Sequence, residues 1–173
     1  MFVQEDIILV DENDLETGFI EKMEAHRKGL LHRAFSIFIY NDKDEWLLHQ
    51  RADNKYHSPG LWTNTCCGHP RKGENTGEAA LRRLNEEMGF NCPIRKIFDF
   101  TYYTDFGNGL FEHELDYVYA GNWNGNPKPD SEEAQKWKWE KPKNVIRDIE
   151  ENPENYTYWF RLIAEKAHEF IAV

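Results

Sequence analysis

The stretch WTNTCCGHPRKGENTGEAALRRLNEEMGF, residues 62–90, holds the densest group of reactive side chains in the chain. Cys67 supplies a thiol and His69 an imidazole, with only Gly68 between them. The segment that follows directly is rich in Arg and Glu. Folding alone does not call for so many reactive groups at one turn. We therefore expect the functional site to be built around this stretch.

The second half of the stretch has the pattern of a helix. Asn75 and Glu78 have the spacing of a capping box, and Gly89 is a stop signal, so we predict a helix over residues 76–88. At 100° per residue one stripe of this helix faces inward and consists of Ala80, Leu84 and Met88.

Two pairs of opposite charges lie four residues apart on this helix. Arg83 and Glu87 flank the inward stripe, whereas Arg82 and Glu86 lie on the side facing solvent. Both pairs have the spacing of ion pairs that stabilise a helix by a few tenths of a kcal/mol. Arg83 and Glu87 are the better functional candidates, because they border the core and can reach into a pocket.

The remaining elements follow from apolar patterns and turn residues. We expect strands over 7–10, 33–40, 46–51, 61–66, 94–104 and 110–120, an edge strand at 137–139, and helices over 142–150 and 155–170. Gly18 is expected near the turn of a first hairpin, and no linker divides the chain. The order predicts a single α+β domain spanning residues 1–173.

Composition limits the classes of function. The net charge of −10 argues against a general nucleic-acid or anionic-membrane binder, since both need a positive field. No apolar run approaches the ~18 residues of a membrane span, and the first residues do not resemble a signal peptide. Three cysteines, two of them adjacent, make a poor disulfide framework. We expect a cytoplasmic protein.

The spacing of the central stretch resembles the Nudix box, Gly-x5-Glu-x7-Arg-Glu-U-x-Glu-Glu-x-Gly-U, where U is aliphatic or aromatic. Every fixed position from Gly68 to Phe90 matches except one, because Arg83 stands where the box has Glu. The resemblance implies a Nudix-like mixed β-sheet core flanked by helices. Nudix hydrolases use the helix carboxylates to bind divalent cations that activate water against a diphosphate. A guanidinium in place of one carboxylate removes a metal ligand and adds a diphosphate clamp.

That departure, together with Asn64-x-Cys66-Cys67-Gly68-His69-Pro70, resembles the type 1 isopentenyl-diphosphate isomerase family over nearly the whole chain. The resemblance implies a metal-dependent isomerase that interconverts isopentenyl and dimethylallyl diphosphate through a carbocation-like intermediate, a step of isoprenoid precursor biosynthesis. It implies a small diphosphate substrate, and we expect a monomer or homodimer.

A mixed set of imidazoles and carboxylates matches the metal ligands of that family: His26, His32, His69, Glu112 and Glu114. In a strand, Glu112 and Glu114 share one face and His113 points the other way. Such a set suits Zn²⁺ or Mn²⁺. Asp116, on the same face, is expected behind the ligands or in solvent. The other histidines match nothing in the family and are expected to be ordinary surface or core residues: His49, His57 and His168.

The resemblance assigns Cys67 and Glu114 to an opposed acid–base pair. Tyr102 matches a tyrosine that hydrogen-bonds the glutamate, and Trp159 an aromatic ring over the hydrocarbon end of the substrate. Ordinary sheet and helix packing remain alternatives for these two. Cys66 alternates to the opposite side and is expected to be a small buried residue.

The diphosphate needs local positive charge. Four basic residues match the family's positions, although isolated Lys and Arg are usually solvated: Lys22, Arg51, Lys55 and Arg83. Glu87, with the backbone carbonyl of Cys67, is expected to hold a Mg²⁺ that bridges the phosphates.

Two other functions explain parts of this pattern. A Nudix hydrolase of a nucleoside diphosphate derivative explains the box, but not Arg83 or the pairing of Cys67 with Glu114. A non-catalytic metal-binding protein on the same fold predicts tight metal binding without turnover.

Overall fold

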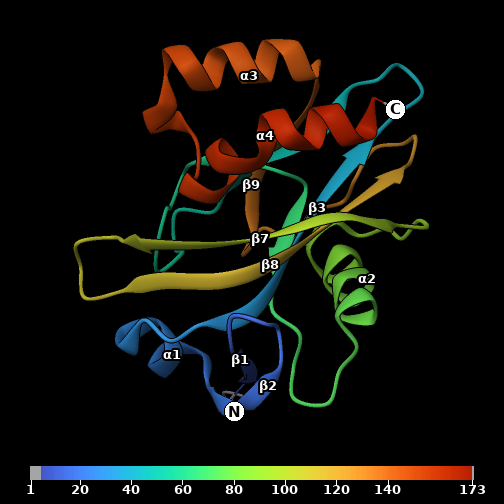
Figure 1. Cartoon of the computed structure of the whole chain (residues 1–173). Coiled ribbons are helices and arrows are strands. Elements are labelled where there is room, and N and C mark those ends of the chain that lie inside the picture. Colours follow the sequence, from blue (N-terminus) through green and yellow to red (C-terminus); the bar gives the residue numbers. More distant parts are fainter. Residues whose placement is uncertain (1–4, 173) are drawn as a thin grey trace.

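The computed structural model describes residues 5–172, which build one nine-stranded sheet with helices on both faces (Figure 1). The strands are β1 (Asp6–Val10), β2 (Glu16–Glu21), β3 (His32–Tyr40), β4 (Trp46–Arg51), β5 (Trp62–Thr63), β6 (Cys66–Gly68), β7 (Arg95–Asp105), β8 (Phe111–Asn122) and β9 (Ala134–Glu140). The helices are α1 (Lys22–Lys28), α2 (Thr76–Met88), α3 (Pro142–Glu151), the 3-10 turn η1 (Pro153–Asn155) and α4 (Tyr158–Ile171). Strands β3 and β8 pair in parallel and the other strand pairs are antiparallel, so the predicted α+β fold with a mixed sheet is confirmed.

Strand β3 is the centre of the sheet. One of its edges pairs with β8 over its full length. Its other edge is shared by three strands, with β1 at the start, β6 in the middle and β4 at the end. Side chains from Ala34 to Ile39 are all buried, as expected for a strand that is covered on both faces.

Two apolar clusters lie on the two faces of this strand. Phe35, Ile37 and Ile39 pack against the inward stripe of α2, whereas Phe38 packs against α4 through Phe160. In Figure 1 helices α3 and α4 lie together, apart from α2. The helices formed within residues 5–172 are all too short or too polar to cross a membrane.

The predicted helix over 76–88 is confirmed, with the same first and last residues. The side chain of Asn75 accepts hydrogen bonds from the backbone N–H groups of Gly77 and Glu78. Gly89 ends the helix with a φ of 75°, a left-handed conformation that glycine adopts without strain.

Three local predictions were wrong. Gly18 lies within β2 opposite Leu9, because the turn is made by residues 11–15 around the carboxylate of Asp11. The single strand expected over 61–66 is two short strands, β5 and β6. Helix α4 begins three residues later than expected, at Tyr158, because Tyr156 is extended and bridges to Trp62.

The start of α4 is tied directly to the central stretch. The Thr157 N–H donates to the Trp62 carbonyl at 3.0 Å, and the hydroxyls of Thr157 and Thr63 lie 2.9 Å apart. These contacts fix where Trp159, the second residue of the helix, meets the sheet.

His49 is a core residue, as expected. It lies in β4, is 3% exposed, and its Nδ1 donates to the Thr65 carbonyl at 2.9 Å. Burial lowers its pKa to about 4, because a charged imidazolium would lose its hydration there.

This histidine gives the fold a specific sensitivity to acid. Between pH 6.5 and about 4 the unfolded chain binds a proton at His49 that the folded chain does not, so stability falls as pH falls. From about pH 7.5 to about pH 5, the wild type should lose about 2 kcal/mol more than His49→Asn, whose amide replaces the Nδ1 donor. Urea unfolding at the two pH values measures the difference, and equal losses in both proteins would contradict the assignment.

Candidate functional site

One cavity of about 280 Å³ is lined by every predicted site residue except His26 and His32, which are fully buried. Its walls come from α1, β3, the loop between β4 and β5, β6, α2, β7, β8 and α4. The chain thus brings together residues as far apart in sequence as Lys22 and Trp159.

The pairing of three strands places a row of functional side chains. Glu114 in β8 lies opposite His32 in β3 on one side and opposite Tyr102 in β7 on the other. Glu112 lies two residues earlier, on the same face of β8, as predicted. His113 faces away, where its Nδ1 lies 3.1 Å from the Gly29 carbonyl.

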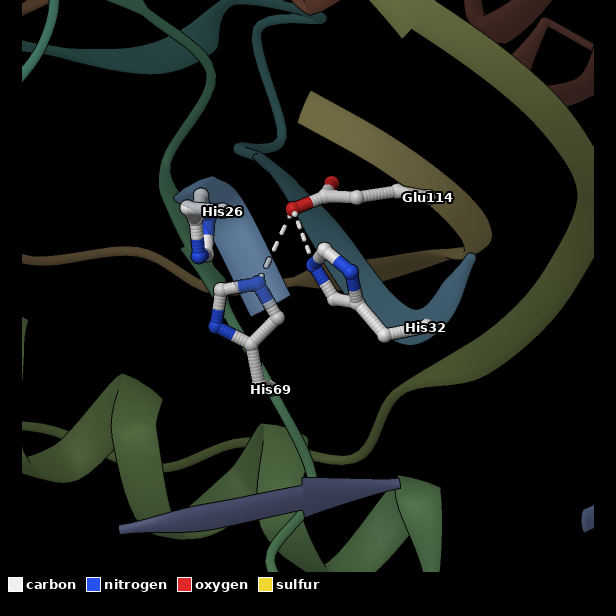
Figure 2. A group of neighbouring side chains, drawn as sticks. All are labelled: His26, His32, His69 and Glu114. Atoms are coloured by element: carbon white, nitrogen blue, oxygen red, sulfur yellow. Dashed lines mark hydrogen bonds and ion pairs between the residues drawn. The ribbon is translucent and has the colours of Figure 1, made fainter. Parts of the chain in front are cut away.

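The five predicted metal ligands, here called the His/Glu group, come together: His26, His32, His69, Glu112 and Glu114. Figure 2 shows the rings of His32 and His69 directed at one oxygen of Glu114. Their Nε2 atoms lie 3.4 Å and 2.9 Å from this oxygen. His26 Nε2 lies 3.1 Å from Glu112 Oε1. The buried His32 Nε2 has no hydrogen-bond partner, as expected of a ring nitrogen placed to bind a cation. The donor set fits a borderline divalent ion.

Electrostatics keep these carboxylates ionised. Burial alone would raise the pKa of Glu112, but His57 and His26 hold it well below the usual range of glutamate. Burial and the charge of Glu112 raise the pKa of Glu114, and the contacts with His32 and His69 outweigh both. Burial lowers the pKa of His69 to about 4, so this imidazole is neutral and able to bind a metal.

Cys67 faces the cavity, while Cys66 is fully buried on the opposite side against α2, as predicted from their alternation. The Cys67 thiol donates to the Asn64 side-chain oxygen at 3.3 Å and lies 3.7 Å from the Ser36 hydroxyl. Burial raises the pKa of this thiol, and the charges of Asp116 and Glu87 raise it further. The thiol therefore keeps its proton.

Asp116 is not solvated, so one of the two alternatives for it was wrong. It is 1% exposed, and its Oδ2 accepts a hydrogen bond from Ser36 at 2.8 Å. Its other oxygen has no hydrogen-bond partner. Burial and the charge of Glu114 raise its pKa well above the usual range.

Tyr102 and Trp159 both reach the cavity rather than only packing in the core. The Tyr102 hydroxyl lies 2.8 Å from Glu114 Oε2 and 3.2 Å from Glu112 Oε2. Trp159 is 3% exposed, and the guanidinium of Arg51 lies 5.4 Å from its ring centroid.

Two of the predicted basic residues pair with carboxylates in the cavity wall. Arg83 bonds to Glu86 at 2.7 Å, Glu87 at 2.5 Å and Glu133 at 3.1 Å. Lys55 also pairs with Glu133. Burial lowers the pKa of Lys22, which lines the same cavity.

Glu87 is 5% exposed, and burial raises its pKa although the charge of Arg83 opposes this. Arg82, which was expected to face solvent, also lines the cavity, where it pairs with Glu74 at 2.7 Å and with Glu86 at 3.2 Å.

Sequence reasoning missed several residues of the cavity, Glu133 and His57 among them. Glu133 comes just before β9 and no local pattern marked it. His57 was expected to be ordinary, but it is buried in the cavity wall with its Nε2 3.3 Å from Glu112 Oε1. The loop that carries it has no periodicity, and the only signal was an imidazole close to Arg51 and Lys55.

Comparison with known proteins agrees with this geometry. The family model described as the NUDIX domain matches residues 30–161. Isopentenyl-diphosphate Delta-isomerase 2 of Aromatoleum aromaticum is 48% identical over 91% of this chain and 83% of that protein. The isopentenyl-diphosphate Delta-isomerase of Serratia proteamaculans is 48% identical over 93% of this chain and 90% of that protein.

Solved structures show the same fold at low sequence identity. A Deinococcus radiodurans protein has a TM-score of 0.80 at 20% identity and covers 94% of this chain and 98% of its own. A MutT protein of Methanosarcina mazei has a TM-score of 0.66 at 18% identity, covering 80% and 94%.

The geometry of the His/Glu group predicts that a divalent cation stabilises the folded chain. Mn²⁺ at about a hundred times its dissociation constant should add about 2.7 kcal/mol to the free energy of unfolding. Thermal melts of chelator-treated protein with and without Mn²⁺ measure this. His32→Ala should remove the rise in Tm, and His113→Ala, on the opposite face, should keep it. An equal Tm of the wild type with and without Mn²⁺ would contradict a metal site.

Proposed function

The chain belongs to the isopentenyl-diphosphate Delta-isomerase family of Nudix proteins, and we propose how the residues of its cavity carry out that family's reaction. The reaction interconverts isopentenyl diphosphate and dimethylallyl diphosphate. A proton is added to the terminal methylene carbon, and a proton is lost from the carbon two bonds away. The double bond moves between them, and a tertiary cation or a species close to it lies between the two steps.

Cys67 and Glu114 are the proposed proton carriers, and their presence in one cavity is the observation that carries the proposal. They come from β6 and β8, which pair with opposite edges of β3, so a carbon chain can lie between them. A buried thiol that holds its proton and an ionised carboxylate form one acid and one base. Tyr102 orients the carboxylate through its hydroxyl.

The aromatic wall has two proposed tasks. The ring of Trp159 lies where a π-face can stabilise the positive charge that develops on the hydrocarbon. Together with Tyr102 it keeps water from the cation, which water would otherwise trap as an alcohol. Asn64 and Ser36 hold the Cys67 sulfur in place through the contacts described above.

The diphosphate is proposed to bind to Arg83, Arg51, Lys55 and Lys22, which all line the cavity. Glu87, with the Cys67 carbonyl, is proposed to hold the Mg²⁺ that accompanies the phosphates. Arg83 shares its guanidinium with three carboxylates, and a diphosphate can replace these as a bidentate partner.

The His/Glu group is proposed to hold one divalent cation, Zn²⁺ or Mn²⁺. When bound, this cation supplies positive charge that lowers the proton affinity of Glu114. The chain's own residues still perform each proton transfer.

The hydrolase alternative is not favoured. The relatives described above are named isomerases, and Arg83 occupies the position of a carboxylate that the hydrolase box requires. Arg83 also neutralises the charge of the neighbouring Glu87, which weakens the binding of several cations by the carboxylates of α2.

We also propose that residues 1–173 act as a single domain in the cytoplasm, as a monomer or homodimer without nucleic acid or membrane. Cys66, Cys67 and Cys92 are all free thiols, which supports a reducing compartment.

The reaction class is tested by incubating the metal-loaded protein with isopentenyl diphosphate and Mg²⁺ in deuterated water. Deuterium should appear in the methyl group of dimethylallyl diphosphate, because one transferred proton exchanges with solvent. Phosphate release from nucleotide substrates without any allylic product would reject the isomerase in favour of the hydrolase.

The same assay tests the proton carriers. Cys67→Ala should lower turnover by about 10²–10⁴-fold, as expected for loss of a positioned proton donor or acceptor. The dissociation constant for isopentenyl diphosphate, measured by calorimetry, should change little. Cys92→Ala is the matched control, because this thiol lies outside the cavity. Near-wild-type turnover in Cys67→Ala would show that the thiol is not a proton carrier.

Arg83→Glu tests the diphosphate clamp by restoring the carboxylate of the hydrolase box. It places four carboxylates together and removes the bidentate donor, so binding of isopentenyl diphosphate should weaken by at least about tenfold. Arg147→Glu, on the exposed surface of α3, controls for the change in net charge. Unchanged affinity in Arg83→Glu would count against the clamp.

A further inference from the structure

Four imidazoles, rather than three, surround the two buried carboxylates. The fourth belongs to His57, in the loop between β4 and β5, and this side chain is 5% exposed. His57 and His26 approach the same oxygen of Glu112, at 3.3 Å and 3.1 Å from their Nε2 atoms. The ligand atoms of these three residues all lie within 4.8 Å of one another.

Of the other histidines outside the His/Glu group, none shares this arrangement in the described part of the chain. His49 bonds to a backbone carbonyl, His113 faces Gly29, and His168 packs edge-on against Trp46. His57 alone among them pairs with a carboxylate.

The ring of His57 is held in one orientation by its neighbours. It stacks on Phe106 with a centroid distance of 4.7 Å and an angle of 7°. Tyr56 and Trp159 contact it edge to face at 4.5 Å and 5.6 Å. Its Nδ1 lies 3.4 Å from the Ser58 hydroxyl, which leaves Nε2 directed at Glu112. A fixed ring loses little freedom when it binds an ion.

The same division of the two ring nitrogens recurs in the His/Glu group. His26 Nδ1 donates to the Lys22 carbonyl at 2.7 Å, and His32 Nδ1 donates to the Leu30 carbonyl at 2.8 Å. Metal-binding histidines use one nitrogen for such a partner and the other for the metal. In His57, likewise, Nδ1 faces the Ser58 hydroxyl, and Nε2 is left to bind a metal.

The spacing also fits coordination. Two adjacent ligands of an ion with bonds of about 2.1 Å at right angles lie about 3 Å apart. The four imidazole–carboxylate contacts measure 2.9, 3.1, 3.3 and 3.4 Å, and the His57 contact is one of them. The distance from His57 to Glu112 is therefore in the same range as the distances from His69 and His32 to Glu114.

We propose that His57 is a further ligand of the divalent cation held by the His/Glu group, reaching it beside Glu112. The ligand atoms form two sets that have His26 in common: His26, His32, His69 and Glu114, and His26, His57 and Glu112. His26 has only Nε2 available, so one cation is shared rather than two bound, and its binding must draw the two sets closer together. The inference rests on the proposed use of a divalent cation at this group.

Co²⁺ loading of the whole chain tests the ligand directly by NMR. Each ligated imidazole gives its own set of contact-shifted ring signals, so the wild type should show four sets with one Co²⁺ per chain, and His57→Ala should show three. Chelator competition should show Co²⁺ affinity reduced by at least about 10–100-fold in His57→Ala. His113→Ala is the matched control and should keep four sets and the wild-type affinity.

The number of signal sets in the wild type tests the proposal by itself, so the test still holds if His57→Ala does not fold. Three sets in the wild type, with the ring of His57 unshifted, overturn the proposal and leave the isomerase mechanism intact. Binding of two Co²⁺ ions per chain would overturn the inference that the two sets of ligands share one cation. A wild type that binds no Co²⁺ overturns both this ligand and the proposed metal.

Discussion

The arrangement of the site depends on two carboxylates buried side by side. Glu112 and Glu114 lie on one face of β8 at 3% and 6% exposure, and burying two negative charges together is costly unless both are compensated. The compensation comes from α1, β3, the residue just after β6 and the loop after β4, each of which contributes an imidazole, and from the hydroxyl of Tyr102. The positions of these elements are therefore linked to one electrostatic requirement.

The features that the sequence predicted are local ones. The capping residues and periodicity of residues 76–88 predicted α2 to the residue, and alternation correctly separated Cys66 from Cys67 and His113 from its neighbours. These properties depend only on near neighbours in the chain. Roles assigned by resemblance remain predictions, although the fold brings all of those residues to one place.

The features that the sequence did not predict depend on long-range contacts. His57 faces Glu112 because its ring stacks on Phe106, which follows β7 far along the chain. The sequence left open whether Asp116 is buried, and its buried carboxyl group accepts a hydrogen bond from Ser36 on the neighbouring strand β3. The first residue of α4 depends on a bridge between Trp62 and Tyr156. No pattern within a short window contains these partners.

The parallel pairing of β3 with β8 has a consequence for how the protein folds. It joins His32 to Glu114 across a long intervening stretch of chain, and such non-local parallel contacts form slowly because a large loop must close first. The carboxylates meet the imidazoles only after that step. A cation that needs both kinds of ligand therefore binds the folded chain and not its folding intermediates. Its binding shifts the equilibrium between folded and unfolded chains toward the folded state.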